Sequence, residues 1–371
     1  RSVSRGLGDV YKRQYCINIL DTPGHQDFSE DTYRTLMAAD SAVMVIDASK
    51  GVEAQTRKLF KVCVMRHIPI FTFINKLDRE AKDTFELLDD IEKELGIATC
   101  PINWPIGSGK EFKGVYDRAK REVELFSDTK KGTAMGEVKM IPIDAPETEE
   151  LIGADAKDIL ADEIELLDGA AAEFDQELVD KGQLSPVFFG SALTNFGVET
   201  FLKHFLKMTT SPLPRKSDHG EIDPMTEKDF SAFVFKIQAN MNKAHRDRIA
   251  FMRICSGEFE AGMSVYHVQG GKDVRLSQPQ QMMASERKMI DKAYGGDIIG
   301  VFDPGIFSIG DTLTTSKEKF AYEGIPTFAP EHFARVRQVD TMKRKQFIKG
   351  INQIAQEGAI QIFQEYNTGM E

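Results

Sequence analysis

Several features that often assign a function are scarce or absent in this sequence. The four cysteines are scattered without paired spacing, at positions 16, 63, 100 and 255, which argues against a zinc knuckle or a disulfide framework and is typical of a reducing cytosol. The seven histidines show no close metal-ligand pairing either. No apolar stretch is long enough to span a membrane, and no signal-peptide pattern precedes the first apolar run, so we expect a cytoplasmic protein without a membrane partner.

Negative charge dominates the composition, but it is concentrated in one segment. The formal net charge is −11, and the segment 144–180 alone holds fourteen acidic residues against the single Lys157. The rest of the chain therefore sums to +2, so its surface is free to meet phosphate wherever basic residues cluster. The acidic segment itself is typical of a solvated helical surface rather than of a specific binding site.

The first apolar run, residues 15–20, predicts a buried strand that opens into a loop. The loop consists of Asp21, Thr22, Pro23, Gly24 and His25. At the carboxyl end of a strand in an open α/β sheet, the Asp21 carboxylate can hold Mg²⁺ through water. Gly24 lets a backbone N–H approach a phosphate closely, and His25 can orient an attacking water. The alternative is an ordinary Asp-Pro-Gly turn at a strand end.

Two further strand ends carry polar groups suited to a guanine base. The apolar run 68–74 is followed by Asn75, Lys76, Leu77 and Asp78, and the run 187–189 is followed shortly by Ser191, Ala192 and Leu193. The Asp78 carboxylate can accept from the ring N–H and the exocyclic amine, which adenine does not present together. The Asn75 amide can bond N7, the stem of Lys76 can lie on the ring, and the Ala192 N–H can meet the guanine carbonyl oxygen. Ser-Ala alone is a weak signal, but three such elements in this order are hard to explain by chance.

These three loops resemble those of the translational GTPases, in which DTPGH, NKLD and SAL serve γ-phosphate, guanine and guanine support. Longer segments, among them INWPIGSGKEFKGVYDR, HRDRIAFMRICSGEFEAGM and KGINQIAQEGAIQIF, resemble more narrowly the bacterial class II release factors, over about residues 15–371. The resemblance implies a ribosome-dependent GTP hydrolase of translation termination that binds GTP or GDP with Mg²⁺ and stimulates release of class I release factors.

The same resemblance assigns roles to residues and names partners. It implies His25 as the catalytic residue, Asp21 as the residue that positions Mg²⁺, and the loops at 21–25, 75–78 and 191–193 as the nucleotide site. Its partners would be ribosomal RNA, ribosomal proteins and class I release factors, and the protein would act as a monomer.

The resemblance has gaps. Residues 1–14 do not match the family, and we interpret them as a foreign head, with a disordered basic arm as the alternative. No Gly-x-x-x-x-Gly-Lys-Ser/Thr motif occurs, so the backbone nest and lysine that hold the β-phosphate are missing, as is the Thr of the first switch. The run Gly107–Lys110 lacks the spacing and the hydroxyl residue of that motif and predicts a hairpin turn. We therefore expect the polypeptide as given to be an inactive nucleotide- or ribosome-binding remnant; an elongation-factor-G-like GTPase is the other alternative.

Patterning along the chain predicts an α/β fold followed by all-β and α+β parts. Apolar runs alternate with amphipathic helical stretches near 28–39, 53–66, 83–95 and 197–208, which indicates βαβ units around the parallel sheet of a P-loop GTPase-type domain. This domain is expected to be partial, with its N-terminal part missing. Strand-sized runs near 231–237, 248–254, 263–268 and 297–301, broken by glycine turns, predict a β-barrel, and the resemblance makes it elongation-factor-Tu-like.

These patterns give a domain plan. The GTP-binding domain is expected at 15–215, with an insertion at about 100–185 that has its own strands and acidic helices. The β-barrel follows at 216–325. By resemblance, 326–371 opens an α+β third domain that the chain does not complete. Its basic helical stretch contains Lys343, Arg344, Lys345 and Lys349, and it either contacts ribosomal phosphate or is a solvated helix face.

Overall fold

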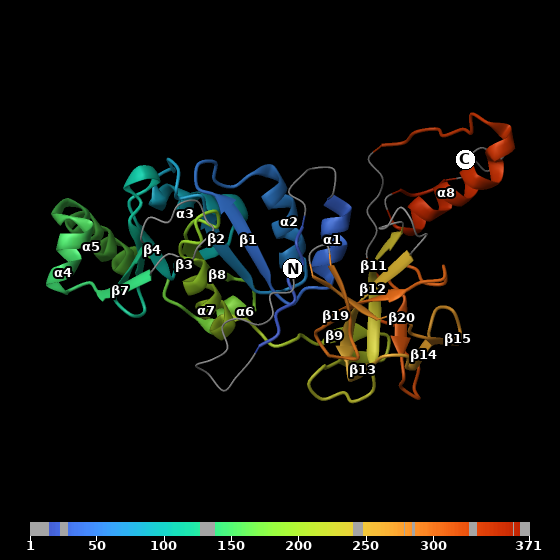
Figure 1. The fold of residues 1–371 in the computed structure, drawn as a ribbon. Coiled ribbons are helices and arrows are strands. Elements are labelled where there is room, and N and C mark those ends of the chain that lie inside the picture. The colour runs from blue at the N-terminus through green and yellow to red at the C-terminus, as the bar shows by residue number, and fades with distance from the viewer. Residues whose placement is uncertain are drawn as a thin grey trace. The chain divides into compact units, whose positions relative to one another are not determined.

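The computed structural model of this chain describes most of its residues and divides them into two units. The described residues are 15–22, 29–126, 138–239, 248–277, 279–283, 286–325, 332–358 and 360–363. One unit comprises residues 40–210, and the other comprises the described residues before position 40 together with those from 211 onward. Figure 1 shows the helices and strands of each unit.

The unit at 40–210 is built on a four-stranded parallel sheet. Its strands, in spatial order, are β1 (Ala42–Asp47), β2 (Ile70–Asn75), β8 (Leu184–Phe189) and β3 (Ala98–Pro101). The pairings β1–β2, β2–β8 and β8–β3 are all parallel, as the alternation of strands and helices predicts. Because parallel strands end at the same edge of a sheet, the last residues of β1, β2 and β8 lie close together.

Helices accompany these strands where the sequence predicts them. They are α2 (Ala54–Met65), α3 (Thr84–Leu95) and α7 (Val198–Met208). Helix α3 begins after Asp83, whose side chain accepts hydrogen bonds from two backbone N–H groups of the first turn, and it ends at Gly96, which has a φ of 70°. Strands β2 and β8 are buried along almost their whole length, as strands covered on both faces should be.

The chain between β3 and β8 forms a second sheet with its own helices. The antiparallel strands are β4 (Asn103–Ile106), β5 (Gly114–Asp117), β6 (Glu122–Phe126) and β7 (Val138–Pro142). The helices are α4 (Pro146–Ile152), α5 (Ala154–Ala170) and α6 (Gln176–Asp180). The run Gly107–Lys110 lies in the connection between β4 and β5, where a 3₁₀ turn spans Gly109–Glu111, so it forms a hairpin connection as predicted.

A buried polar cluster joins α7 to this inserted sheet. The His204 Nε2 lies 3.0 Å from Asp117 Oδ2 on β5, and the Lys120 ammonium lies 3.1 Å from the same oxygen. The Thr200 hydroxyl donates to the Glu124 carboxylate on β6. Burial would raise the pKa of Asp117, but the hydrogen bonds of His204 and Lys120 outweigh it and hold that pKa at about 2. Burial raises the pKa of Glu124. Helix α7 is thereby fixed to the insertion by buried hydrogen bonds from His204 and Thr200 to carboxylates of β5 and β6.

Residues 15–20 do not form the strand that the apolar run predicts, so this prediction is wrong. Apart from a bridge at Asn18 they lie outside regular secondary structure, and they belong to the unit that holds the β domain. The Asn18 amide donates to Asp297 Oδ1 at 3.0 Å, and Leu20 packs against an apolar cluster of that unit. An apolar run predicts that its side chains are buried, but it does not specify the surface that buries them. A strand also requires a neighbouring strand with which to pair. The helix predicted near 28–39 is present as α1 (Ser29–Met37), but it belongs to the unit of the β domain and not to that of the parallel sheet around which it was expected.

The other unit contains the antiparallel β domain that was expected. Eight strands form one sheet in the order β15, β14, β20, β11, β12, β19, β16, β17. Their bounds in that order are Lys272–Arg275, Ser264–His267, Thr312–Thr314, Ser231–Ala239, Arg248–Ser256, Ile298–Phe302, Gln280–Met283 and Glu286–Met289. Two smaller pairs are β9 (Arg215–Ser217) with β10 (Gly220–Ile222), and β13 (Glu258–Glu260) with β18 (Lys292–Tyr294). The four strands predicted from the sequence are present as β11, β12, β14 and β19.

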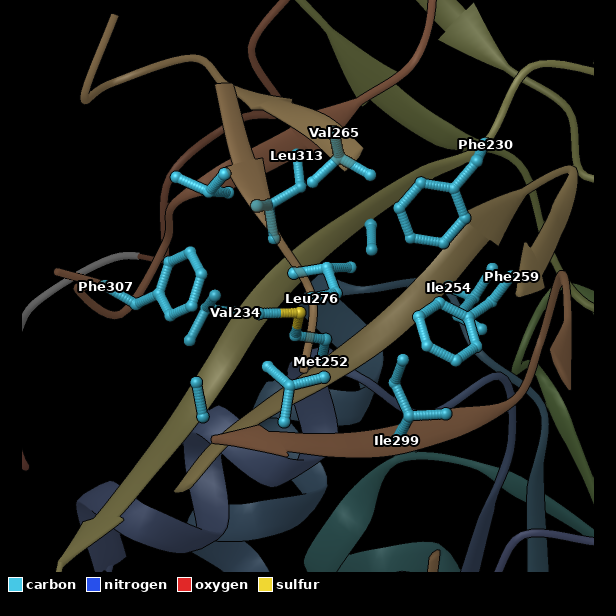
Figure 2. Packing of buried hydrophobic residues seen from close by; sticks show 14 of the residues in the cluster. Phe230, Val234, Met252, Ile254, Phe259, Val265, Leu276, Ile299, Phe307 and Leu313 are labelled. Atoms are coloured by element: carbon cyan, nitrogen blue, oxygen red, sulfur yellow. The ribbon is translucent and has the colours of Figure 1, made fainter. Parts of the chain in front are cut away.

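The β domain has an apolar core of its own (Figure 2). Val234 of β11, Met252 and Ile254 of β12, and Ile299 of β19 are all at most 1% exposed. The spacing of two between Met252 and Ile254 is the period of a strand with one face toward the core. Such a core is what an independently folding domain requires.

A helix follows the β domain. It is α8 (Arg344–Gln356), preceded by a 3₁₀ turn at Thr341–Lys343, and no side chain of this helix is buried. The Arg34 guanidinium of α1 donates to the Gly358 carbonyl oxygen at 2.9 Å, just beyond the end of α8. All four cysteines lie in the described part of the chain, and none of them forms a disulfide bond with another described cysteine. Among the described helices, none has the length and apolar character that crossing a lipid bilayer requires.

Candidate guanine-binding site

Neighbouring strand ends of the parallel sheet bring the predicted base-binding loops together. Asp47 and Asn75 are register partners at the ends of β1 and β2. On the other side of β2, Ile74 pairs with Phe189 of β8, and the Gly190 N–H donates to the Ile74 carbonyl oxygen at 3.0 Å. The loops at 75–78 and 191–193 therefore begin at adjacent strand ends.

The Asn75 side chain joins the two loops. Its Oδ1 accepts hydrogen bonds from the Ala192 N–H and from the Lys76 N–H, both at 2.8 Å. Because the oxygen is used in this way, the Nδ2 group is left as a donor, which is what the N7 acceptor of a purine requires. The Ala192 N–H, which we expected to meet the guanine carbonyl oxygen, donates here to Asn75. A bound base therefore has to share this donor with Asn75 or displace it.

Ser191 orients Asp78. Its hydroxyl donates to Asp78 Oδ1 at 2.6 Å, and Ser191 is fully buried whereas the Asp78 side chain is 19% exposed. The Asp78 Oδ2 lies 3.9 Å from the Arg79 Nε. A carboxylate held through one oxygen presents the other in a fixed direction, and an ionised carboxylate acts only as an acceptor. Asp78 is thus arranged to receive donors from a ligand.

Lys76 pairs with Asp47, a residue that our prediction from the sequence omitted. The Lys76 Nζ lies 2.7 Å from Asp47 Oδ2, while Asp47 Oδ1 accepts from the N–H and the hydroxyl of Ser49 at 2.9 and 2.7 Å. Partial burial would raise the pKa of Asp47, but the hydrogen bonds from Lys76 and Ser49 outweigh it and lower that pKa to about 2. The carboxylate therefore stays charged at neutral pH. A signal was present, since Asp47 ends an apolar run just as Asn75 does.

Two residues of the predicted site differ in burial. Leu77 is 2% exposed; its N–H donates to the Gly190 carbonyl oxygen at 3.3 Å, and its own carbonyl accepts from the Gly109 N–H at 2.8 Å. Leu77 therefore anchors the loop through its backbone and its buried side chain. Leu193, by contrast, is 68% exposed.

Residues of the insertion supply hydrogen-bond and packing partners to the end of β8 and to the 191–196 loop that follows it. The buried Asn103 side chain accepts from the Phe189 N–H at 2.7 Å and donates to the Phe189 carbonyl oxygen at 3.1 Å. In addition, the Phe126 ring of β6 stacks on Phe196, with ring centroids 4.3 Å apart and planes 5° apart. Phe196 in turn exchanges two backbone hydrogen bonds of 2.9 Å with Ser191. The insertion thus supports the 191–196 loop from both of its ends.

The predicted phosphate and metal loop is described only in part. Asp21 is exposed and Thr22 partly buried, and both belong to the unit that holds the β domain. Pro23, Gly24 and His25 lie outside the described residues. Carboxylate and hydroxyl oxygens are ligands that suit Mg²⁺, which commonly keeps several waters. Within the described residues, no group of three or more His, Cys, Asp and Glu side chains is arranged to hold a metal ion.

Models of three protein families match the chain. "Elongation factor Tu GTP binding domain" matches residues 2–211, "Elongation factor G domain 2" matches 229–316, and "Class II release factor RF3, C-terminal domain" matches 322–371. A crystal structure of a protein from Thermus thermophilus shares the fold, with a TM-score of 0.70 at 21% identity over 94% of this chain and 52% of that one. The parallel sheet with its two loops, followed by the β domain, places the chain in the class of translational GTPases.

Sequence relatives narrow this class. The peptide chain release factor 3 of Symbiobacterium thermophilum is 62% identical over 94% of this chain and 65% of that protein. Proteins of the same name from Trichormus variabilis and Ligilactobacillus salivarius are each 54% identical over 95% of this chain, and the matches cover 65% and 67% of those proteins. The chain belongs to the peptide chain release factor 3 family. It spans about two thirds of the length of these relatives.

Proposed function

We propose that this chain is the nucleotide-binding and β-domain part of a ribosome-dependent GTPase that dissociates class I release factors after peptide release. The observation that carries the proposal is the pair of joined loops at 75–78 and 191–193. Asn75 accepts from the Ala192 N–H and Ser191 donates to the Asp78 carboxylate, so the two loops to which the proposal assigns guanine are joined by hydrogen bonds, which supports a shared role. Relatives named peptide chain release factor 3 support the choice of this function over an elongation-factor-G-like one.

Base recognition follows from the donors and acceptors of these loops. The Asp78 carboxylate accepts from the ring N–H and the exocyclic amine of guanine, and adenine does not present this pair of donors. The Asn75 Nδ2 donates to N7, and the aliphatic stem of Lys76 lies along the ring. Leu77 holds the 75–78 loop through its backbone and its buried side chain, and Leu193 follows Ala192 in the other loop.

The remaining roles in the proposal belong to the loop at 21–25. Asp21, next to Thr22 and Pro23, would hold Mg²⁺ through water, and a bound ion would supply positive charge against the phosphates. Gly24 presents its N–H to the γ-phosphate, and His25 orients the attacking water. The strategy is positioning and charge neutralisation, without a covalent intermediate. The partners in the proposal are ribosomal RNA, ribosomal proteins and class I release factors.

A second proposal applies to the polypeptide as given. The sequence contains no Gly-x-x-x-x-Gly-Lys-Ser/Thr motif, whose N–H groups and lysine hold the β-phosphate in related enzymes. Residues 1–371 on their own then bind GDP weakly and hydrolyse no GTP with ribosomes. Calorimetric titration with GDP tests this directly, and tight binding would contradict it.

The test of the main proposal uses a completed chain. The completed chain is the present chain joined to the part of the Symbiobacterium thermophilum relative that it does not match, with a Gly-x-x-x-x-Gly-Lys-Ser/Thr loop placed before residue 15. Asp78→Asn in the completed chain should shift preference from GTP to XTP, because the amide offers a donor where the carboxylate only accepts. The matched control is Asp89→Asn, at an exposed carboxylate paired with Lys93.

Two readouts decide the outcome. Competition between GTP and XTP reports base specificity, and turnover with ribosomes carrying a class I release factor reports the proposed activity. An unchanged preference for GTP in Asp78→Asn would refute the base site. Ribosome-independent turnover, or turnover that leaves the release factor bound, would refute the function in termination.

A further inference from the structure

Asp47 stands beside the candidate base site, and its carboxylate pairs with the ammonium group of Lys76. It ends β1 and is the register partner of Asn75, the first residue of the base-binding loop. Its side chain is 11% exposed and its Oδ2 lies 2.7 Å from the Lys76 Nζ, whose own side chain is 46% exposed. The pair therefore joins a largely buried, fixed acceptor to a long cationic side chain that would otherwise move freely.

The carboxylate is held independently of the lysine. Its Oδ1 accepts from the N–H and hydroxyl of Ser49, and its backbone carbonyl accepts from the Gly51 N–H at 2.9 Å. Gly51 has a φ of 78°, a conformation that suits glycine and closes this turn. A lysine bound to such an anchor gives up its rotamers before a ligand arrives, so binding need not order them.

The backbone of Lys76 is also committed to this arrangement. Its φ of 73° lies in the left-handed region, which is rare for a residue with a side chain. The Lys76 N–H donates to Asn75 Oδ1, so the residue that joins the two loops also fixes this turn. The backbone and the ammonium group of Lys76 are therefore both restrained, so the aliphatic stem between them has few conformations available.

We infer that Asp47 is a positioning residue of the guanine site, which holds the Lys76 stem in the course that a bound base requires. This inference rests on the proposed function, because it gives Lys76 its role against the ring. Asp47 contributes through Lys76 alone and leaves discrimination between bases to Asp78.

A double-mutant cycle in the completed chain tests the inference. Asp47→Asn keeps an oxygen for Ser49 but places a donor opposite the lysine, and it should weaken GDP binding about ten-fold. Lys76→Met keeps the stem and removes the charge, and it should weaken binding by a similar factor. Because Asp47 acts through Lys76, adding Asp47→Asn to Lys76→Met should cause no further loss. The preference for GDP over XDP should stay unchanged in both single variants.

The outcomes are distinguishable. If the unchanged completed chain binds no GDP, the proposed function fails. If it binds GDP and Asp47→Asn binds equally well, or if the two losses multiply in the double variant, only the role of Asp47 is overturned. Trp104 is the single tryptophan of residues 1–371 and lies in the same unit as Asp47 and Lys76, so its fluorescence in the present chain with the same substitutions reports whether that unit folds. If Asp47→Asn is unfolded, Asp47→Ser keeps a short polar cap for the turn and takes its place in the cycle.

Discussion

Replacing Asn103 with alanine should destabilise the unit at 40–210 and loosen the loop that carries Ser191. The Asn103 side chain is fully buried and makes both of its hydrogen bonds to the backbone of Phe189, 86 residues away in the chain. Strand β3 stops pairing with β8 at Pro101. Beyond that point the Asn103 side chain takes the place of the β3 backbone as the hydrogen-bond partner of β8. Alanine would leave a buried N–H and a buried carbonyl without partners. At about 1–3 kcal/mol for each unsatisfied group, we expect a loss of roughly 3 kcal/mol.

The single tryptophan makes this loss measurable in one unit. Trp104 adjoins Asn103 in sequence, is fully buried and donates through its Nε1 to the Glu163 carboxylate at 2.8 Å. Its fluorescence during urea unfolding therefore follows the unit at 40–210 and not the β domain. Asn103→Asp retains an acceptor for the Phe189 N–H but sets a carboxylate against the Phe189 carbonyl, so it should be at least as harmful as alanine.

The control is Lys58→Ala, at an exposed position of α2, which should change stability by less than about 0.5 kcal/mol. A loss below about 1 kcal/mol in Asn103→Ala would refute the reasoning, because it would mean that the strand end finds other partners for its backbone groups. In the completed chain, the same substitution should also weaken GDP binding, since Gly190 and Ser191 follow Phe189 directly.

Three other predictions follow from the described contacts and the proposed roles. His25→Ala in the completed chain should leave GTP binding nearly intact but slow ribosome-stimulated turnover, and a joint loss of binding and turnover would indicate a structural role. The pKa of Asp117 is lowered to about 2 from an ordinary 3.8, so its interactions with His204 and Lys120 together contribute roughly 2 kcal/mol above pH 4, and this contribution is lost as the pH falls toward 2. Asp117→Asn should therefore lower stability at pH 7 and flatten the acid limb of the Trp104 unfolding profile, and an unchanged limb would contradict the assignment. Neutralising Lys343, Arg344 and Lys345 together should weaken ribosome binding and flatten its dependence on salt, whereas an unchanged slope would mean that this helix face meets only solvent.

The sequence was most informative where a short motif has a fixed relation to a strand end. The quartet beginning at Asn75 and the Ser191–Leu193 stretch follow apolar runs, and parallel strands carry such ends to one edge, so their shared edge could be predicted. That β8 lies directly beside β2, with β3 on its other side, is known only from the structure. The Gly107–Lys110 run could be recognised as a hairpin because its spacing fails the phosphate-loop pattern. Both inferences depend on local spacing.

Other features depend on partners that local spacing does not name. The apolar run at 15–20 predicted burial, and Leu20 does pack against an apolar cluster. The strand prediction was wrong because nothing in the run specifies which surface it contacts. Asn103 could not be singled out, since a side chain that bonds a backbone 86 residues away leaves no periodic signal. Asp47 could have been found by applying to β1 the rule that identified Asn75.

The contacts between the insertion and the 191–196 loop bear on how this protein could be shortened. Strands β3 and β8 are adjacent and parallel, so on a topology diagram residues 102–183 look like a module that a short crossover could replace. The side chain of Asn103, the N–H of Gly109 and the ring of Phe126 would leave with that module. A minimal version of the domain would then keep every residue assigned to guanine and lose the parts that hold those residues in place. Engineering by deletion must therefore graft a substitute amide and aromatic partner, or accept a base site with the right composition and the wrong geometry.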